Sequence, residues 1–153
     1  MADQETIMNK ADERRPLLEV KNLRKAFPIK KSLTGKVQQE LIAVDDVSFK
    51  LYPGETLGIV GESGCGKTTM GRTILRLHDA SGGEIIYNGK NIENYSKSKM
   101  RSLRTEMQII FQDPYSSLPP RATVGDILSE PVRVHKIVPP SQVKDYVIDL
   151  MEQ

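Results

Sequence analysis

The nine residues Gly61–Thr69, Gly-Glu-Ser-Gly-Cys-Gly-Lys-Thr-Thr, constrain the fold more than any other stretch of the chain. They fit the pattern G-x-x-x-x-G-K-[ST] and follow the apolar run Thr56–Val60. A helical pattern comes next, with one apolar face formed by Met70, Ile74 and Leu77. Strand, glycine-rich turn and helix, in this order, form the setting in which the pattern binds phosphate. The sequence therefore predicts a phosphate-binding loop between a strand buried on both faces and a helix.

Each residue type in this loop suits one part of a nucleoside triphosphate with its magnesium ion. Glycines let successive backbone N–H groups point inward toward phosphate oxygens, and the first N–H groups of the helix add donors. The Lys67 ammonium suits the β- and γ-phosphates, and the Thr68 hydroxyl suits Mg²⁺. The predicted binding residues are Gly61, Glu62, Ser63, Gly64, Cys65, Gly66, Lys67, Thr68 and Thr69.

Composition places the chain among globular proteins of about one domain. It has 153 residues, 38% of them hydrophobic and 27% charged, with a net charge of +2. The single cysteine excludes an internal disulfide and is typical of a reducing compartment. Residues 1–16 are polar and are expected to form a mobile tail rather than a secretory signal. His78 and His135 have no acidic or cysteine partners at ligand spacing, so no metal site built from the protein alone is predicted.

Periodicity and turn residues predict a mixed α/β chain. Strands are expected at 17–27, 41–52, 56–60, 84–87 and 106–111, and a solvated loop at 29–40. Pro28 predicts an edge position or a strand end, and Asn88-Gly89 predicts a tight hairpin turn. Helices are expected at 67–77, 96–104, 123–130 and from 141 onward, with Thr123 and Ser141 as caps and Pro131 as a stop. The last helix is expected to present one apolar face, made of Val143, Val147, Leu150 and Met151.

Several segments together resemble the ATP-binding subunits of ABC transporters, and among these the oligopeptide and dipeptide importer branch. The resemblance runs from about residue 17 to about residue 135, and its motifs combined are far more specific than the phosphate loop alone. The segments that carry it are Ala43–Phe49, Pro53–Glu55, Gly58–Thr69, Gly71–Leu77 and Met107–Pro114.

The resemblance implies an α/β fold with a P-loop core, an N-terminal antiparallel β portion and the start of a helical subdomain. The ATP-binding domain would occupy residues 17–153, with the core and β portion at 17–112 and the helical subdomain from 113. It implies ATP and Mg²⁺ as cofactors and an ATPase that powers peptide import. Phe27 would stack on adenine, Thr68 and Gln112 would reach Mg²⁺, and Lys67 and Gln112 would act in catalysis.

The partners implied by the resemblance are the membrane subunits of the transporter and a second ATPase subunit, identical or different. The cytoplasmic helix of a membrane subunit would contact Tyr115–Arg121, where Pro119 replaces the Asn that is usual in this branch. The protein would lie at the cytoplasmic face of the plasma membrane. Neither nucleic acid nor direct contact with the cargo is expected.

Three features of the family are missing from the sequence: the Leu-Ser-Gly-Gly-Gln signature, an apolar strand ending in Asp-Glu, and a later histidine. The Asp-Glu strand supplies the carboxylate that anchors the metal and the base that polarises water. The chain is therefore interpreted as the front portion of a longer ATPase. We expect little hydrolysis, weak ATP binding and poor solubility from these 153 residues by themselves.

Three other function classes fit parts of the sequence. A soluble P-loop kinase or GTPase is suggested by N-K-x-D at Asn9–Asp12 and D-x-x-G at Asp79–Gly82, but neither motif has the strand that would position it. A non-transport ABC protein acting on nucleic acid would need a basic groove with aromatic side chains, and only 5% of the residues are aromatic. A truncated product with only a binding or regulatory role is the third class.

Overall fold

The computed structural model describes residues 15–31, 37–113 and 117–152, which form two compact units, Met1–Ser96 and Lys97–Gln153. The tail predicted at the N-terminus lies almost entirely outside the described residues. The division after Ser96 comes earlier than the expected start of the helical subdomain after Gln112. No helix in the described part of the chain combines the length and the apolar character that crossing a bilayer requires.

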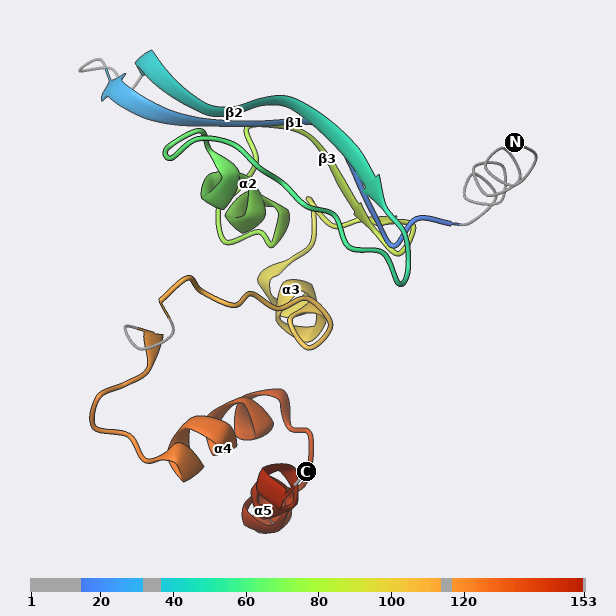
Figure 1. Cartoon of the computed structure of the whole chain (residues 1–153), viewed down its shortest axis with the longest axis vertical. Coiled ribbons are helices and arrows are strands. Elements are labelled where there is room, and N and C mark those ends of the chain that lie inside the picture. The colour runs from blue at the N-terminus through green and yellow to red at the C-terminus, as the bar shows by residue number, and fades with distance from the viewer. Residues whose placement is uncertain (1–14, 32–36, 114–116, 153) are drawn as a thin grey trace. The chain divides into compact units, whose positions relative to one another are not determined.

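An antiparallel sheet forms the larger part of the first unit (Figure 1). Its strand order is β2-β1-β3-β4, with β1 at Leu18–Lys31, β2 at Val37–Leu51, β3 at Gly82–Tyr87 and β4 at Lys90–Asn91. This sheet confirms the expected N-terminal antiparallel β portion. The bounds predicted for the loop at 29–40 are wrong at both ends. The ladder between β1 and β2 continues as far as the pair formed by Lys31 and Val37. Backbone pairing satisfies the N–H and C=O groups there although most of the side chains are polar.

Local turn chemistry accounts for two features of the sheet. Asn88 and Gly89 both have positive φ, 47° and 74°, as the two-residue turn between β3 and β4 requires. The predicted hairpin is therefore confirmed. Pro28 lies beyond Arg24, the last β1 residue paired with β3, so the missing N–H of this proline falls where β1 has become an edge.

Helix α2, Lys67–Ile74, packs on one face of the sheet (Figure 1). Its buried residues Met70 and Ile74 are 7% and 8% exposed. The helix ends three residues before the predicted Leu77, because Arg76 takes a left-handed conformation with φ of 52°. Leu77 is 41% exposed instead of sharing the buried face. The core of the unit is completed by side chains that are 0–1% exposed: Val20, Leu23, Thr73, Ile85 and Ile92.

The strand predicted at Thr56–Val60 is absent, which corrects the expectation of a buried parallel strand. These residues form an irregular segment, and Leu57, Ile59 and Val60 are 44%, 46% and 94% exposed. A parallel strand exists only when neighbouring strands accept its backbone hydrogen bonds. Within the described residues the only sheet is the antiparallel one, and none of its strands pairs with this segment.

The second unit is helical, with α3 at Lys97–Leu103, α4 at Val124–His135, η2 at Pro140–Gln142 and α5 at Val143–Glu152. Its buried centre joins α4 to α5 through Val132, Val143 and Val147. The predicted apolar face of the last helix is half right, because Leu150 and Met151 remain 43% and 61% exposed.

Two further predictions for this unit are wrong. Helix α4 continues through Pro131 to His135 instead of stopping at Glu130. Burial of Val132 on its inner face outweighs the missing hydrogen bond of the proline. The expected strand at 106–111 is an irregular segment in which Ile110 is 95% exposed. As with residues 56–60, no strand among the described residues pairs with it.

Candidate functional site

Gly66 joins the predicted phosphate loop to the sheet. It is the residue before α2 and has φ of 96°, a left-handed conformation that glycine adopts without a side-chain penalty. A Cβ at this position would lie 2.1 Å from the carbonyl oxygen of Ala43 in β2. The loop backbone therefore rests directly on β2, and only glycine fits there.

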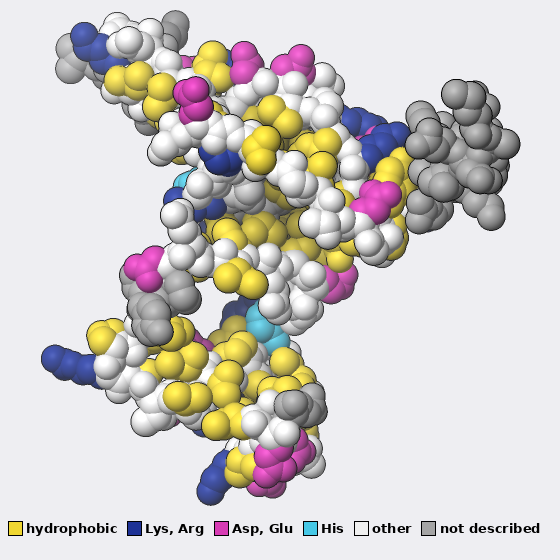
Figure 2. Space-filling model, viewed as in Figure 1, with side chains coloured by type: hydrophobic (Ala, Val, Ile, Leu, Met, Phe, Trp, Pro, Cys, Tyr) yellow, Lys and Arg dark blue, Asp and Glu magenta, His cyan; other side chains and the backbone are white. Residues whose placement is uncertain are grey.

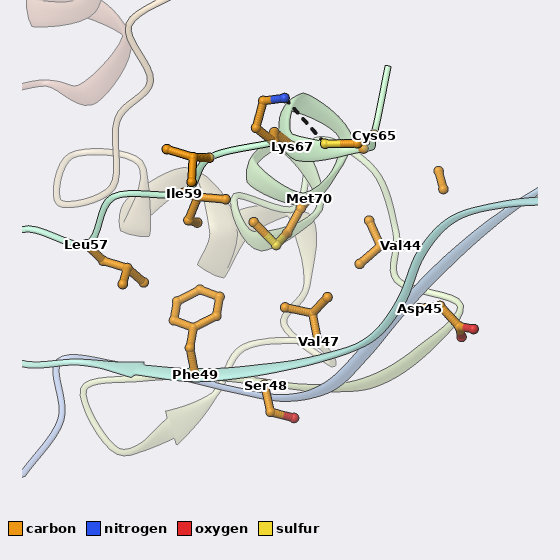
Figure 3. A pocket seen from close by; sticks show the side chains of 13 residues that line it. Val44, Asp45, Val47, Ser48, Phe49, Leu57, Ile59, Cys65, Lys67 and Met70 are labelled. Atoms are coloured by element: carbon orange, nitrogen blue, oxygen red, sulfur yellow. Dashed lines mark hydrogen bonds between the residues drawn. The ribbon is translucent and has the colours of Figure 1, made fainter. Parts of the chain in front are cut away.

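The Lys67 ammonium lies over the loop and is held by loop atoms. Nζ donates to the carbonyl oxygens of Gly61 at 2.7 Å and Glu62 at 2.6 Å, and lies 3.3 Å from Sγ of Cys65. The contact with Cys65 is the dashed line in Figure 3. A cation that two carbonyl oxygens neutralise only in part can exchange them for phosphate oxygens, which carry full charges.

The N-terminus of α2 has donors but no anionic side chain. No side chain caps the helix at Gly66, and its first turn contains no acidic residue. The Thr68 side chain is exposed beside this helix start. Free N–H groups and the helix dipole make such an end suited to an anion.

A cavity of about 450 Å³ lies beneath the loop, between β2, the segment 57–60 and α2. Figure 3 shows its apolar side chains, among them Phe49, Leu57 and Met70, pointing toward one another. Apolar walls do not suit a triphosphate, which needs N–H donors and cations. The cavity is therefore the imperfectly filled space between loop and sheet rather than a candidate phosphate site.

Phe27, the residue predicted to stack on the base, is half-buried on β1. It pairs with Leu41 of β2, two residues from the Ala43 carbonyl on which Gly66 rests. With about 3.4 Å per residue along a strand and about 5 Å between strands, Phe27 lies on the order of 10 Å from the loop. The sheet register thus brings the predicted base-binding and phosphate-binding residues into one region.

Gln112 and most of Tyr115–Arg121 belong to the second unit. Gln112 is exposed in an irregular segment rather than at the end of a strand. Residues 114–116 lie outside the described part of the chain, and 117–121 are mostly exposed. The roles expected of Gln112 and of this region remain predictions.

The structure also brings His78 to Phe27, next to Lys25, which lies two residues before Phe27 on the same strand. His78 packs its ring against the Phe27 ring, and the Lys25 ammonium lies above that ring. His78 is 51 positions away along the chain, so no local pattern could have found the contact. Within the described residues no group of three or more His, Cys, Asp or Glu side chains could hold a metal ion.

Comparison with known proteins relates this chain to one family. The sequence profile of the family described as ABC transporter matches residues 44–152. The glutathione import ATP-binding protein GsiA of Escherichia coli is 50% identical over 138 residues, 90% of this chain and 22% of that protein. Its counterpart in Shigella flexneri matches with the same figures. The chain thus spans about a fifth, 22%, of the length of these curated relatives.

Solved structures agree on the fold. The dimeric structure of MJ0796, a bacterial ABC transporter cassette, matches with a TM-score of 0.69 and 19% identity over 88% of this chain and 56% of that one. A second structure of that cassette, in a post-hydrolysis state bound to ADP and Pi, matches equally well. At this level of identity the comparison supports the fold alone, which is the expected α/β cassette in partial form.

Proposed function

Because the chain belongs to the ABC transporter family, we propose that it is the ATP-binding part of the motor subunit of a peptide importer. The 50% identity with a glutathione import ATP-binding protein supports this assignment. Glutathione is a small peptide, which agrees with the importer branch that the sequence resembles. The cargo need not touch this chain, so the proposal rests on the ATP site.

The observation that carries the proposal is the phosphate loop itself. Lys67 lies over the loop, Gly66 is pressed against β2, and the start of α2 has neither a cap nor an acidic residue. In the proposed complex the β- and γ-phosphates receive hydrogen bonds from the N–H groups between Gly61 and Thr69. The Lys67 ammonium turns from the loop carbonyls to the phosphates.

The donors available for magnesium fit that ion. The Thr68 hydroxyl and the Gln112 amide oxygen are hard oxygen ligands of the kind Mg²⁺ prefers, and few protein ligands are needed when phosphates and water complete the shell. The bound ion would neutralise charge that develops on the phosphates during their hydrolysis. Gln112 would also orient the attacking water. Phe27 would stack on the adenine ring.

The rest of the proposal concerns the whole subunit. Two ATPase subunits would close on two ATP molecules and push the membrane subunits, with Tyr115–Arg121 near a cytoplasmic helix of the membrane partner. Hydrolysis would reset the assembly. The protein would then act at the cytoplasmic face of the membrane.

Two measurements test the proposal. Calorimetry of the 153-residue chain with Mg²⁺ should show binding of ATP that exceeds binding of GTP. Purification of the full-length subunit from cells should bring with it a membrane protein with several membrane-spanning helices. A clear preference for GTP, or purification of the full-length subunit without such a protein, would remove the importer assignment.

A further inference from the structure

The Phe27 ring is held by two side chains from different parts of the first unit. The His78 ring meets it edge to face, with 5.6 Å between ring centroids and an interplanar angle of 88°. The Lys25 ammonium lies 4.7 Å from the centre of the Phe27 ring, over one face. A perpendicular neighbour sets the tilt of an aromatic ring, and a cation above the ring is attracted to its π electrons.

A hydrogen bond holds Lys25, and the turn after α2 holds His78. Nζ of Lys25 donates to the backbone oxygen of Asp79, next to His78, at 2.7 Å. The turn that ends α2 brings His78 to this place. In that turn Arg76 donates from Nη1 to the carbonyl oxygens of Ile92 at 2.9 Å and Tyr95 at 3.0 Å. Phe27 and its two neighbours, His78 and Lys25, therefore form a defined arrangement rather than a chance surface contact.

This arrangement lies beside the phosphate loop. Lys25 pairs with Val44 in the register of β1 and β2, and Val44 is next to Ala43, on which Gly66 of the loop rests. One element, α2, thus has the phosphate-binding Lys67 at its beginning and leads to His78 at its end. A nucleotide whose phosphates lie at the loop has its base within reach of Phe27.

We propose that His78 and Lys25 position the Phe27 ring as a stacking platform for the nucleotide base. This inference rests on the proposed ATP-binding function, which supplies the nucleotide. His78 then acts on the binding of the base and not on the binding of the phosphates. Its effect appears in the ratio of affinities for Mg-ATP and Mg-tripolyphosphate, a ligand that has phosphates but no base.

The test measures both affinities calorimetrically on the 153-residue chain. Phe27→Ala should weaken ATP binding about 5- to 100-fold, the range found for loss of base stacking on an aromatic residue, and leave tripolyphosphate binding unchanged. His78→Ala should weaken ATP binding about 2- to 10-fold, again without affecting tripolyphosphate. His78→Phe keeps an edge-to-face ring and should restore ATP binding. His135→Ala, which removes the other histidine of the chain from the second unit, is the matched control and should change neither affinity.

The two proposals can fail separately. If His78→Ala leaves the ratio unchanged while the unaltered chain binds both ligands, the positioning role is wrong and the ATP site stands. Equal loss of both ligands in His78→Ala, without rescue in His78→Phe, assigns His78 a purely structural role and also overturns the inference. If the unaltered chain binds neither ligand, the proposed function fails as well.

Discussion

At the scale of single residues, the contact between Gly66 and Ala43 fixes the loop on the sheet. The left-handed φ of Gly66 starts α2 at the point where the loop ends, and its missing side chain lets the loop approach β2. Gly71, five residues further in the same helix, has no heavy atom within 4 Å of the position where a Cβ would be. These two glycines allow a matched comparison.

Gly66→Ala should lower the free energy of unfolding by at least about 2 kcal/mol, because it adds left-handed strain to an overlap with backbone. It should also weaken ATP binding, since the loop can no longer rest on β2. Gly71→Ala should be neutral or stabilising by up to about 1 kcal/mol, because alanine favours a helix interior. Thermal unfolding followed by circular dichroism measures both, and equal effects of the two changes would show that the Ala43 contact is unimportant.

At the scale of elements, α4 begins with a capping box predicted in part by the sequence. Thr123 Oγ1 accepts from the Asp126 N–H at 3.2 Å, and the Asp126 carboxylate accepts from the Thr123 N–H at 3.2 Å. Thr123→Ala should destabilise the second unit by about 1 kcal/mol. Ser141→Ala is the control: the sequence predicts Ser141 as the cap of the last helix, but Ser141 lies inside η2, so this change should stay within about 0.5 kcal/mol. Comparable losses in both variants would deny the capping role of Thr123.

The same capping box predicts an acid dependence. The hydrogen bond from the Thr123 side chain, followed by that from its backbone, holds the pKa of Asp126 below its ordinary value of 3.8. A lowered pKa in the folded state means that this stabilisation is complete above 3.8 and is lost as the pH falls through the folded value. Helicity of α4 should therefore decrease below about pH 4 more steeply than in Asp126→Asn. An equal loss of helicity with falling pH in the unaltered chain and in Asp126→Asn would refute this.

Elements determined by neighbouring residues were predictable, and those determined by distant pairing were not. The Asn88-Gly89 turn and the Thr123 cap depend on residues within three positions of each other. The segments 56–60 and 106–111 have the composition of buried strands, yet their conformation depends on pairing strands that the described residues do not provide. Helix α4 passes Pro131 because contacts with α5 outweigh a local rule.

At the scale of the whole molecule, both units expose apolar side chains, and Figure 2 shows hydrophobic side chains at the surface of each. Val60 and Ile110 are 94% and 95% exposed and lie in the two segments that resemble strands without partners. Exposed apolar segments of high β-propensity promote association between chains. We therefore expect these two segments to be the source of the poor solubility predicted from the sequence.

Val60→Ser combined with Ile110→Ser should reduce self-association of the 153-residue chain without lowering its thermal stability, because neither side chain is packed in a core. Analytical ultracentrifugation across a concentration series measures the association. Val20→Ser, at a position that is 1% exposed, should instead unfold the first unit. Unchanged association in the double variant would mean that other surfaces cause it.

The part of the candidate site that one contiguous motif contains was predictable from the sequence. The residues from Gly61 to Thr69 follow one another along the chain, so the sequence alone predicts the loop, and the roles of Lys67 and Thr68 stay predictions. The contact of His78 with Phe27 depends on the turn after α2, which no local pattern contains, whereas Lys25 and Phe27 are two residues apart in one strand.

The most direct test of the central claim is the affinity of the chain for Mg-ATP with and without the Lys67 ammonium. Lys67→Ala should weaken binding by about 10- to 100-fold, the effect of losing a charge-assisted hydrogen bond to phosphate. Lys90→Ala, which removes an exposed ammonium from the short strand β4, should leave the affinity unchanged. Undiminished ATP binding by Lys67→Ala, measured by calorimetry under identical conditions, would contradict the assignment of the loop as the nucleotide site.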